Sequence, residues 1–273
     1  MPEVGVCSWS LRPASPRELA RDVLSCGVDA VQLALDPLRL GALSESELLA
    51  EFKPNHIRIL SGMMTTVGED YSSLQKIRET GGLRPDQHWP ANLAAAHQNA
   101  ALASRLGLNV VTLHAGFLPH DAADPLRPVM IQRLREVLRA FASKGIRVAF
   151  ETGREDARTL LSVLHELRAE SPGVNFDPAN LILYGMGDPV AAFRELAPHV
   201  VQVHIKDATP PSRPKEWGEE VVVGTGCVEW TKFFDTIAEL RPTVNLLIER
   251  EAGESRVADI KIARKLVMQI GGV

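Results

Sequence analysis

Residues 173–204 read GVNFDPANLILYGMGDPVAAFRELAPHVVQVH and contain one complete strand–helix–strand pattern. Apolar runs at 173–177 and 199–204 flank a helical pattern at 187–196, and this alternation is typical of a βαβ unit in a parallel sheet. The two runs end in residues that can bind a metal ion, Asp177 and His204. This one unit therefore indicates both the architecture and the place of a functional site.

The same alternation extends in both directions along the chain. Further candidate strands lie at 3–8, 29–34, 57–63, 109–114, 146–151 and 244–249. Helical patterns lie at 15–25, 45–53, 90–106, 126–143, 155–169, 187–196, 229–239 and 255–269. Eight βα units in 273 residues give about 34 residues per unit, which matches a (β/α)8 barrel. We predict an α/β fold with a single TIM-barrel domain over residues 1–273. A doubly wound open sheet is the alternative, but no G-x-G-x-x-G follows the first strand.

Composition and charge exclude several classes of protein. Hydrophobic residues make up 45% and charged residues 23% of the chain, as in ordinary globular proteins. The net charge is −4 and basic residues do not cluster, so we expect no nucleic-acid partner. The three cysteines form no C-x-x-C motif, which favours a reducing compartment, and no apolar run reaches the roughly 18 residues that span a bilayer. We expect a cytoplasmic protein without a membrane partner.

Two connections are longer than the usual βα loop of about 2–6 residues. They span residues 64–90 and 207–228, and each follows a predicted strand. In a barrel both would lie at the face formed by the carboxyl ends of the strands, where active sites are found. We expect them to form lids or walls of a substrate site, although packing over helices is the alternative.

The later strands end in ionisable residues. These strand ends carry His114, Glu151, Asp177, His204 and Glu249. In a barrel they would converge on one mouth, where three neighbouring carboxylates would repel one another unless a cation lay between them. Three carboxylates and one imidazole suit Mn²⁺, Mg²⁺ or Co²⁺, with Zn²⁺ also acceptable. The alternative is that each acid caps a following helix, as Asp177 before Pro178 would.

Several phrases in the chain resemble the sugar phosphate isomerase/epimerase family, whose members have a xylose isomerase-like TIM barrel. They are VTLHAGF (111–117), VAFETG (148–153), VNFDPANLILYGMGDP (174–189), VVQVHIKDA (200–208), VGTGCVEW (223–230) and LLIERE (246–251). The family includes D-tagatose 3-epimerase and enzymes of inosose metabolism. The resemblance implies one divalent metal ion, with Mn²⁺ first, held by Glu151, Asp177, His204 and Glu249. It also implies that the two glutamates act as the acid/base pair.

The chemistry that follows is isomerisation or epimerisation of a keto-sugar or a related polyol ketone through an enediolate. A metal ion would polarise the carbonyl, while Glu151 and Glu249 would serve opposite faces of the substrate. Members similar to tagatose epimerase carry a substrate-binding His three residues after the metal Asp and an Arg six residues after the metal His. This chain has Asn180 and Pro210 there, so free ketohexoses are less favoured; Arg213 could replace the arginine.

Further residues are candidates for binding the sugar. They are His114, Lys206, Trp9, Asn180, Glu155 and Trp217. Lys206 shares the inward side of its strand with His204, because strand residues alternate. Most of these candidates also have a purely structural interpretation. Lys206 could form a salt bridge with Glu249, Glu251 or Asp207, and His114 could contact Glu151. Glu155 could stabilise the first turn of its helix, and the tryptophans could pack in the core.

Three other functions remain open from the sequence. A lyase that dehydrates an inosose or a 3-keto-sugar would begin with the same proton abstraction. An endonuclease of the apurinic-site type shares the barrel but needs several zinc ions and more histidines than His114 and His204 at strand ends. The third is a sugar-binding protein without catalysis. A small-molecule sugar or polyol partner is expected, and a homo-oligomer is compatible with the sequence.

Overall fold

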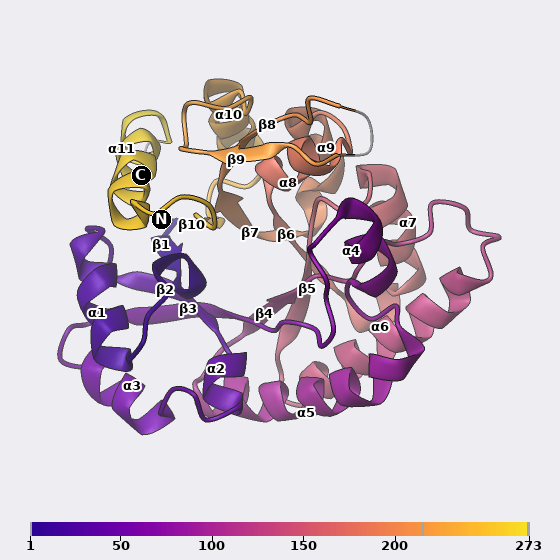
Figure 1. The fold of residues 1–273 in the computed structure, drawn as a ribbon, viewed down its shortest axis with the longest axis horizontal. Helices are drawn as coiled ribbons and strands as arrows, with labels where there is room; N and C mark the ends of the chain where they lie inside the picture. Colours follow the sequence, from indigo (N-terminus) through magenta and orange to yellow (C-terminus); the bar gives the residue numbers. More distant parts are fainter. Residues whose placement is uncertain (1, 214–215, 272–273) are drawn as a thin grey trace.

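The computed structural model describes residues 2–213 and 216–271, and eight parallel strands in it close into a barrel (Figure 1). The barrel strands are β1 Val4–Cys7, β2 Ala30–Ala34, β3 Arg58–Met63, β4 Val110–Leu113, β5 Arg147–Glu151, β6 Gly173–Phe176, β7 Val200–Ile205 and β10 Asn245–Ile248. The barrel closes where β10 pairs with β1. Each predicted strand overlaps one of these eight, so the predicted TIM barrel is confirmed.

Helices surround the barrel (Figure 1). They are α1 Pro16–Ser25, α2 Asp36–Arg39, α3 Glu45–Phe52, α4 Leu74–Thr80, α5 Trp89–Arg105, α6 Leu126–Ala142, α7 Ala157–Glu166, α8 Pro178–Tyr184, α9 Pro189–Leu196, α10 Trp230–Leu240 and α11 Arg256–Ile270, with 3-10 turns η1 Ser8–Leu11, η2 Asp86–His88, η3 Arg168–Glu170 and η4 Ala197–His199. Ser15 and Asp188 accept hydrogen bonds from backbone N–H groups of α1 and α9, and proline follows each. None of the helices in the described part of the chain has the length and hydrophobicity needed to cross a bilayer.

The structure adds elements to the sequence interpretation and moves the start of one helix. The connection 64–90 contains α4, and the connection 207–228 contains an antiparallel hairpin of β8 Asp207–Thr209 and β9 Glu219–Val221. The segment after Asp177 forms α8, because the Asp177 carboxylate accepts hydrogen bonds from two N–H groups of its first turn. Helix α7 begins at 157 rather than 155, because Asp156 is its N-cap.

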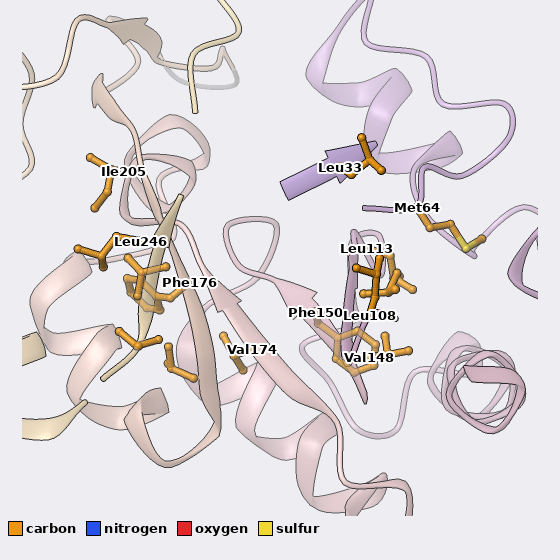
Figure 2. Packing of buried hydrophobic residues seen from close by; sticks show 14 of the residues in the cluster. Leu33, Met64, Leu108, Leu113, Val148, Phe150, Val174, Phe176, Ile205 and Leu246 are labelled. Atoms are coloured by element: carbon orange, nitrogen blue, oxygen red, sulfur yellow. The ribbon is translucent and has the colours of Figure 1, made fainter. Parts of the chain in front are cut away.

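The two sides of the barrel strands differ in polarity. Outward-facing residues form the hydrophobic core against the helices; Leu113 of β4 lies beside Phe150 of β5 in Figure 2. The inward side carries a buried polar layer, which consists of Gln32, Ser61, Thr112, Asn175 and Gln202. Hydrogen bonds connect this layer, and Gln202 Nε2 donates both to Gln32 Oε1 at 2.9 Å and to Asn175 Oδ1 at 3.1 Å. The floor of the site is therefore polar and tightly connected.

Asp207 organises the long connection after β7. Its fully buried carboxylate accepts hydrogen bonds from four backbone N–H groups, those of Ala208, Gly224, Gly226 and Val228, and from Trp230 Nε1. Gly226 is required beside it, because a Cβ there would lie 2.2 Å from Asp207 Oδ1. Asp207 is thus a structural residue and does not pair with Lys206.

We predict that Asp207→Asn lowers the free energy of unfolding by about 3 kcal/mol, because the new amide N–H group would face N–H donors and leave them unpaired. Urea denaturation measures the loss, and limited proteolysis should show faster cleavage within 210–222. Asp188→Asn is the matched control, since asparagine caps a helix as well as aspartate. Equal stability of Asp207→Asn and the wild type would contradict this role.

Candidate metal centre

Four potential metal ligands meet at the mouth of the barrel. Glu151 ends β5, Asp177 follows β6, His204 lies in β7 and Glu249 follows β10, so four neighbouring strands supply them. All are buried, and their ligand atoms lie within 4.8 Å of one another. His204 Nδ1 is 3.7 Å from Glu151 Oε1, 3.9 Å from Asp177 Oδ2 and 3.4 Å from Glu249 Oε2. The structure thus brings together the residues that the sequence selected.

The donor set fits a divalent metal ion. Asp177 Oδ2 is buried and has no hydrogen-bond partner among the described residues, although its other oxygen caps α8. Burial raises the pKa of Asp177 to about 8, and the neighbouring charges of Glu249 and Glu151 add to the rise. An unpaired carboxylate oxygen between two further carboxylates is the arrangement that a bound cation would stabilise.

Gln32 selects which nitrogen of His204 faces the carboxylates. Gln32 Oε1 lies 2.7 Å from His204 Nε2, and an amide oxygen can only accept a hydrogen bond. Burial alone would lower the pKa of His204, but Cys7, Glu151 and Glu249 raise it well above its usual value, so the ring is protonated when no metal ion is bound. When an ion is bound and the ring is neutral, we assign the remaining proton to Nε2, which leaves the lone pair of Nδ1 for the ion. Gln32 is itself fixed, because its Nε2 donates to Thr112 Oγ1 at 2.7 Å. A hydrogen-bonded partner of this kind orients a metal-binding histidine.

We predict that Gln32→Leu weakens Mn²⁺ binding about 10- to 100-fold, because Nε2 loses its acceptor and the ring loses one of the contacts that orient it. Titration calorimetry with Mn²⁺ measures the affinity directly. Gln32→Glu restores an acceptor oxygen and should retain affinity within about tenfold. The exposed substitution Gln98→Leu is the control. Wild-type affinity in Gln32→Leu would show that Gln32 does not orient the ligand.

Lys206 forms a salt bridge with Glu249 and Glu251, which is the role that the sequence offered as the alternative to binding the sugar. Lys206 Nζ lies 2.9 Å from Glu249 Oε2 and 2.7 Å from Glu251 Oε2, and it is 3.4 Å from Asn180 Oδ1. Burial alone would raise the pKa of Glu249, but the charges of Lys206 and His204 outweigh it and hold that pKa well below its usual range. Lys206 keeps Glu249 ionised beside the metal centre.

A cavity of about 270 Å³ adjoins the metal centre. Its walls are Trp9, Ala34, Met63, Met64, Thr65, Thr66, Glu69, Tyr71, His114, Glu249 and Glu251. Trp9 Nε1 donates a hydrogen bond to Glu249 Oε1 at 2.7 Å. His114 Nε2 lies 3.5 Å from Glu151 Oε1, and burial lowers the pKa of His114. Trp9 and His114 therefore line the cavity beside the metal centre.

The other predicted sugar-binding residues occupy different positions. Asn180 contacts the centre, since its Nδ2 donates to Glu151 Oε1 at 3.0 Å. Glu155 is buried, and burial raises its pKa to about 8, but it does not belong to the cavity wall given above. Trp217 stacks on Tyr71 with ring centroids 6.4 Å apart and is likewise outside that wall. Arg213 is largely exposed and lies 3.9 Å from Glu216.

Sequence reasoning missed a buried ion pair above the cavity. Arg154 Nη1 lies 2.9 Å from Glu69 Oε1, and Arg154 also contacts the Tyr71 hydroxyl and ring. Glu69 and Tyr71 line the cavity, so the connection 64–90 does form one of its walls. Glu69 and Tyr71 lie in a segment without hydrophobic periodicity, so no sequence pattern indicated their position. The one available signal for the ion pair was Arg154, which lies three residues after Glu151.

Comparisons with known proteins agree with the fold. The family model described as xylose isomerase-like TIM barrel matches residues 20–267. A similar solved structure is a xylose isomerase domain protein from Planctomyces limnophilus, with 29% sequence identity, a TM-score of 0.83 and 93% of each chain covered. The probable 3-DHS dehydratase AsbF from Bacillus anthracis has 17% identity and a TM-score of 0.74, covering 98% of this chain and 99% of that one. An L-ribulose 3-epimerase has 15% identity and a TM-score of 0.76, with 100% and 95% covered. A search of curated proteins gave no significant match.

Proposed function

The chain belongs to the xylose isomerase-like TIM barrel family, and we propose that it is a divalent-metal-dependent isomerase or epimerase of a keto-sugar or related polyol ketone. The observation that carries the proposal is the buried group of Glu151, Asp177, His204 and Glu249 beside a cavity lined by polar and apolar side chains. The solved epimerase and dehydratase structures share the fold and are consistent with such a reaction.

Glu151 and Glu249 would carry the proton transfers. In the barrel β6 and β7 separate the strands that hold them, so they approach the centre from different sides. Glu151 is held by Asn180 and Asn175, and Glu249 by Trp9 and Lys206. A divalent ion held by the four ligands would supply a Lewis acid that makes the hydrogen next to the substrate carbonyl acidic. We infer that Mn²⁺ is the first ion to test.

The proton balance of the reaction is simple. In an epimerisation, one glutamate starts as the ionised base and removes a proton from the carbon next to the carbonyl, and the other starts protonated and gives its proton to the opposite face of that carbon. The substrate composition is unchanged, and the two carboxylates exchange protonation states. His114 would donate a hydrogen bond to a substrate oxygen, and Lys206 would do so by giving up its bond to Glu251 or Asn180. Trp9 would cover the carbon face of the sugar.

We predict that the Mn²⁺-loaded protein, incubated in D₂O with a panel of keto-sugars and inososes, places deuterium on the carbon next to the carbonyl of its substrate. Glu151→Gln should reduce this exchange at least about 100-fold, because the amide cannot take a proton. NMR measures the exchange, and circular dichroism verifies the fold. Glu195→Gln, on the outer helix α9, is the control. Full exchange by Glu151→Gln would remove Glu151 from the mechanism.

Product analysis in the same incubation separates the lyase alternative. Elimination starts with the same abstraction, so deuterium exchange is common to both, but the product then loses the mass of one water. If the product shows an enone absorbance and that loss of mass, the protein is a dehydratase and not an isomerase. Saturable sugar binding without exchange or elimination would instead assign a binding protein.

We further predict about one metal ion per chain by elemental analysis of the metal-loaded protein, because one group of four ligands with one imidazole suits a single ion. Asp177→Ala should lower this stoichiometry sharply, since it removes the unpaired oxygen. The exposed Asp188→Ala is the control. Three zinc ions per chain would favour the endonuclease alternative and would contradict the proposed function.

A further inference from the structure

A second cavity of about 490 Å³ lies beside the metal-site cavity, and we call it the side groove. Its walls are Ser8, Trp9, Arg12, Pro13, Ala14, Leu19, Leu33, Ala34, Pro37, Ala42 and Leu43. It lies at the carboxyl ends of β1 and β2, between the segment joining η1 to α1 and the segment joining α2 to α3. Trp9 and Ala34 also line the metal-site cavity, so the two cavities adjoin.

Trp9 is the fixed wall between the two cavities. Its Nε1 donates to Glu249 Oε1 at 2.7 Å, and its ring centroid lies 6.1 Å from that of His204. Trp9 O accepts a hydrogen bond from the Arg12 N–H group at 3.3 Å, which holds the turn after β1. Trp9 therefore belongs to both cavities, and its indole also contacts Glu249.

The lining of the side groove favours an uncharged, apolar group. Proline, alanine and leucine side chains form most of it. Ser8 Oγ is already engaged, since it accepts a hydrogen bond from Ala34 N at 2.8 Å, and Trp9 Nε1 is engaged by Glu249. Arg12 is exposed at the rim and lies 3.6 Å from Glu254. A second sugar ring would lose water from several hydroxyls with few partners to replace it, which is unfavourable.

We propose that the side groove binds an apolar aglycone, so that the preferred substrate is a glycoside whose sugar ring keeps a free ketone, such as a 3-keto-aldoside, and carries an uncharged aromatic or aliphatic substituent. The binding of the sugar at the metal centre rests on the proposed function. The binding of the aglycone in the side groove rests on the residues that both cavities share and on the apolar lining of the groove. The aglycone would leave the metal-site cavity past Trp9 and Ala34 and lie against Pro13, Leu33 and Leu43.

The test compares two glycosides that differ in the aglycone alone. Titration calorimetry of the full chain, with and without Mn²⁺, measures the dissociation constants of 4-nitrophenyl 3-keto-β-D-glucopyranoside and methyl 3-keto-β-D-glucopyranoside. We expect the nitrophenyl glycoside to bind at least tenfold more tightly, because its ring buries apolar surface in the groove. Equal affinities, or the absence of saturable binding of the nitrophenyl glycoside, would overturn the proposal.

A groove-filling variant makes the test specific to this place. Ala14 is exposed, so Ala14→Trp fills the side groove with little effect on folding, and it should abolish the tenfold preference while leaving binding of the methyl glycoside unchanged. Ala94→Trp, at an exposed position of α5, is the matched control and should retain the preference. A retained preference in Ala14→Trp would overturn the proposal.

Two further outcomes are distinguishable. If sedimentation shows a dimer that Ala14→Trp converts to a monomer, the groove is an interface between copies and the proposal is overturned. If the nitrophenyl preference is present but no substrate shows deuterium exchange, the side groove is supported and the proposed isomerase function fails alone.

Discussion

The structure depends on one electrostatic constraint, the burial of three carboxylates at one end of the barrel. Glu151, Asp177 and Glu249 are almost inaccessible to solvent and lie within a few ångströms of one another. Burying like charges together is expensive unless cations and hydrogen bonds compensate. Lys206 and His204 supply part of the compensation, but neither is close enough to Asp177 Oδ2 to form a hydrogen bond with it, since they lie 3.8 and 3.9 Å away. The electrostatics and the proposed chemistry therefore favour a divalent ion in the same place.

The polar layer inside the barrel follows from this constraint. Interiors of such barrels are usually filled by branched apolar residues, yet here Gln32, Asn175 and Gln202 are buried beneath the ligands and bonded to one another. Apolar side chains at these positions would leave His204 and Glu151 without partners to fix their orientation. The layer thus exchanges some hydrophobic burial for a rigid set of ligand positions, and rigid ligand positions are needed for selective metal binding.

The sequence predicted the barrel and its ligands because both depend on short-range patterns. A strand that ends in Asp177 or His204 is visible in a few residues, and parallel topology then places such ends together. Contacts between distant segments have no such signal. Arg154 and Glu69 are 85 residues apart, and Glu69 lies in a connection without periodicity. From the sequence, helix capping and metal binding by Asp177 were alternatives, whereas the side chain caps α8 with one oxygen and directs the other into the metal centre.

The two long connections are joined to each other above the site. Tyr71 of the first stacks on Trp217 of the second, Tyr184 of α8 lies edge-on to Trp217, and Arg154 contacts the Tyr71 ring. Four βα units, those of β3, β5, β6 and β7, therefore contribute to this aromatic cluster. An insertion or deletion in one connection would displace the contact between Tyr71 and Trp217. We therefore expect the lengths of the two connections to change together among related proteins. Chimaeras that exchange either connection between relatives would need to carry both.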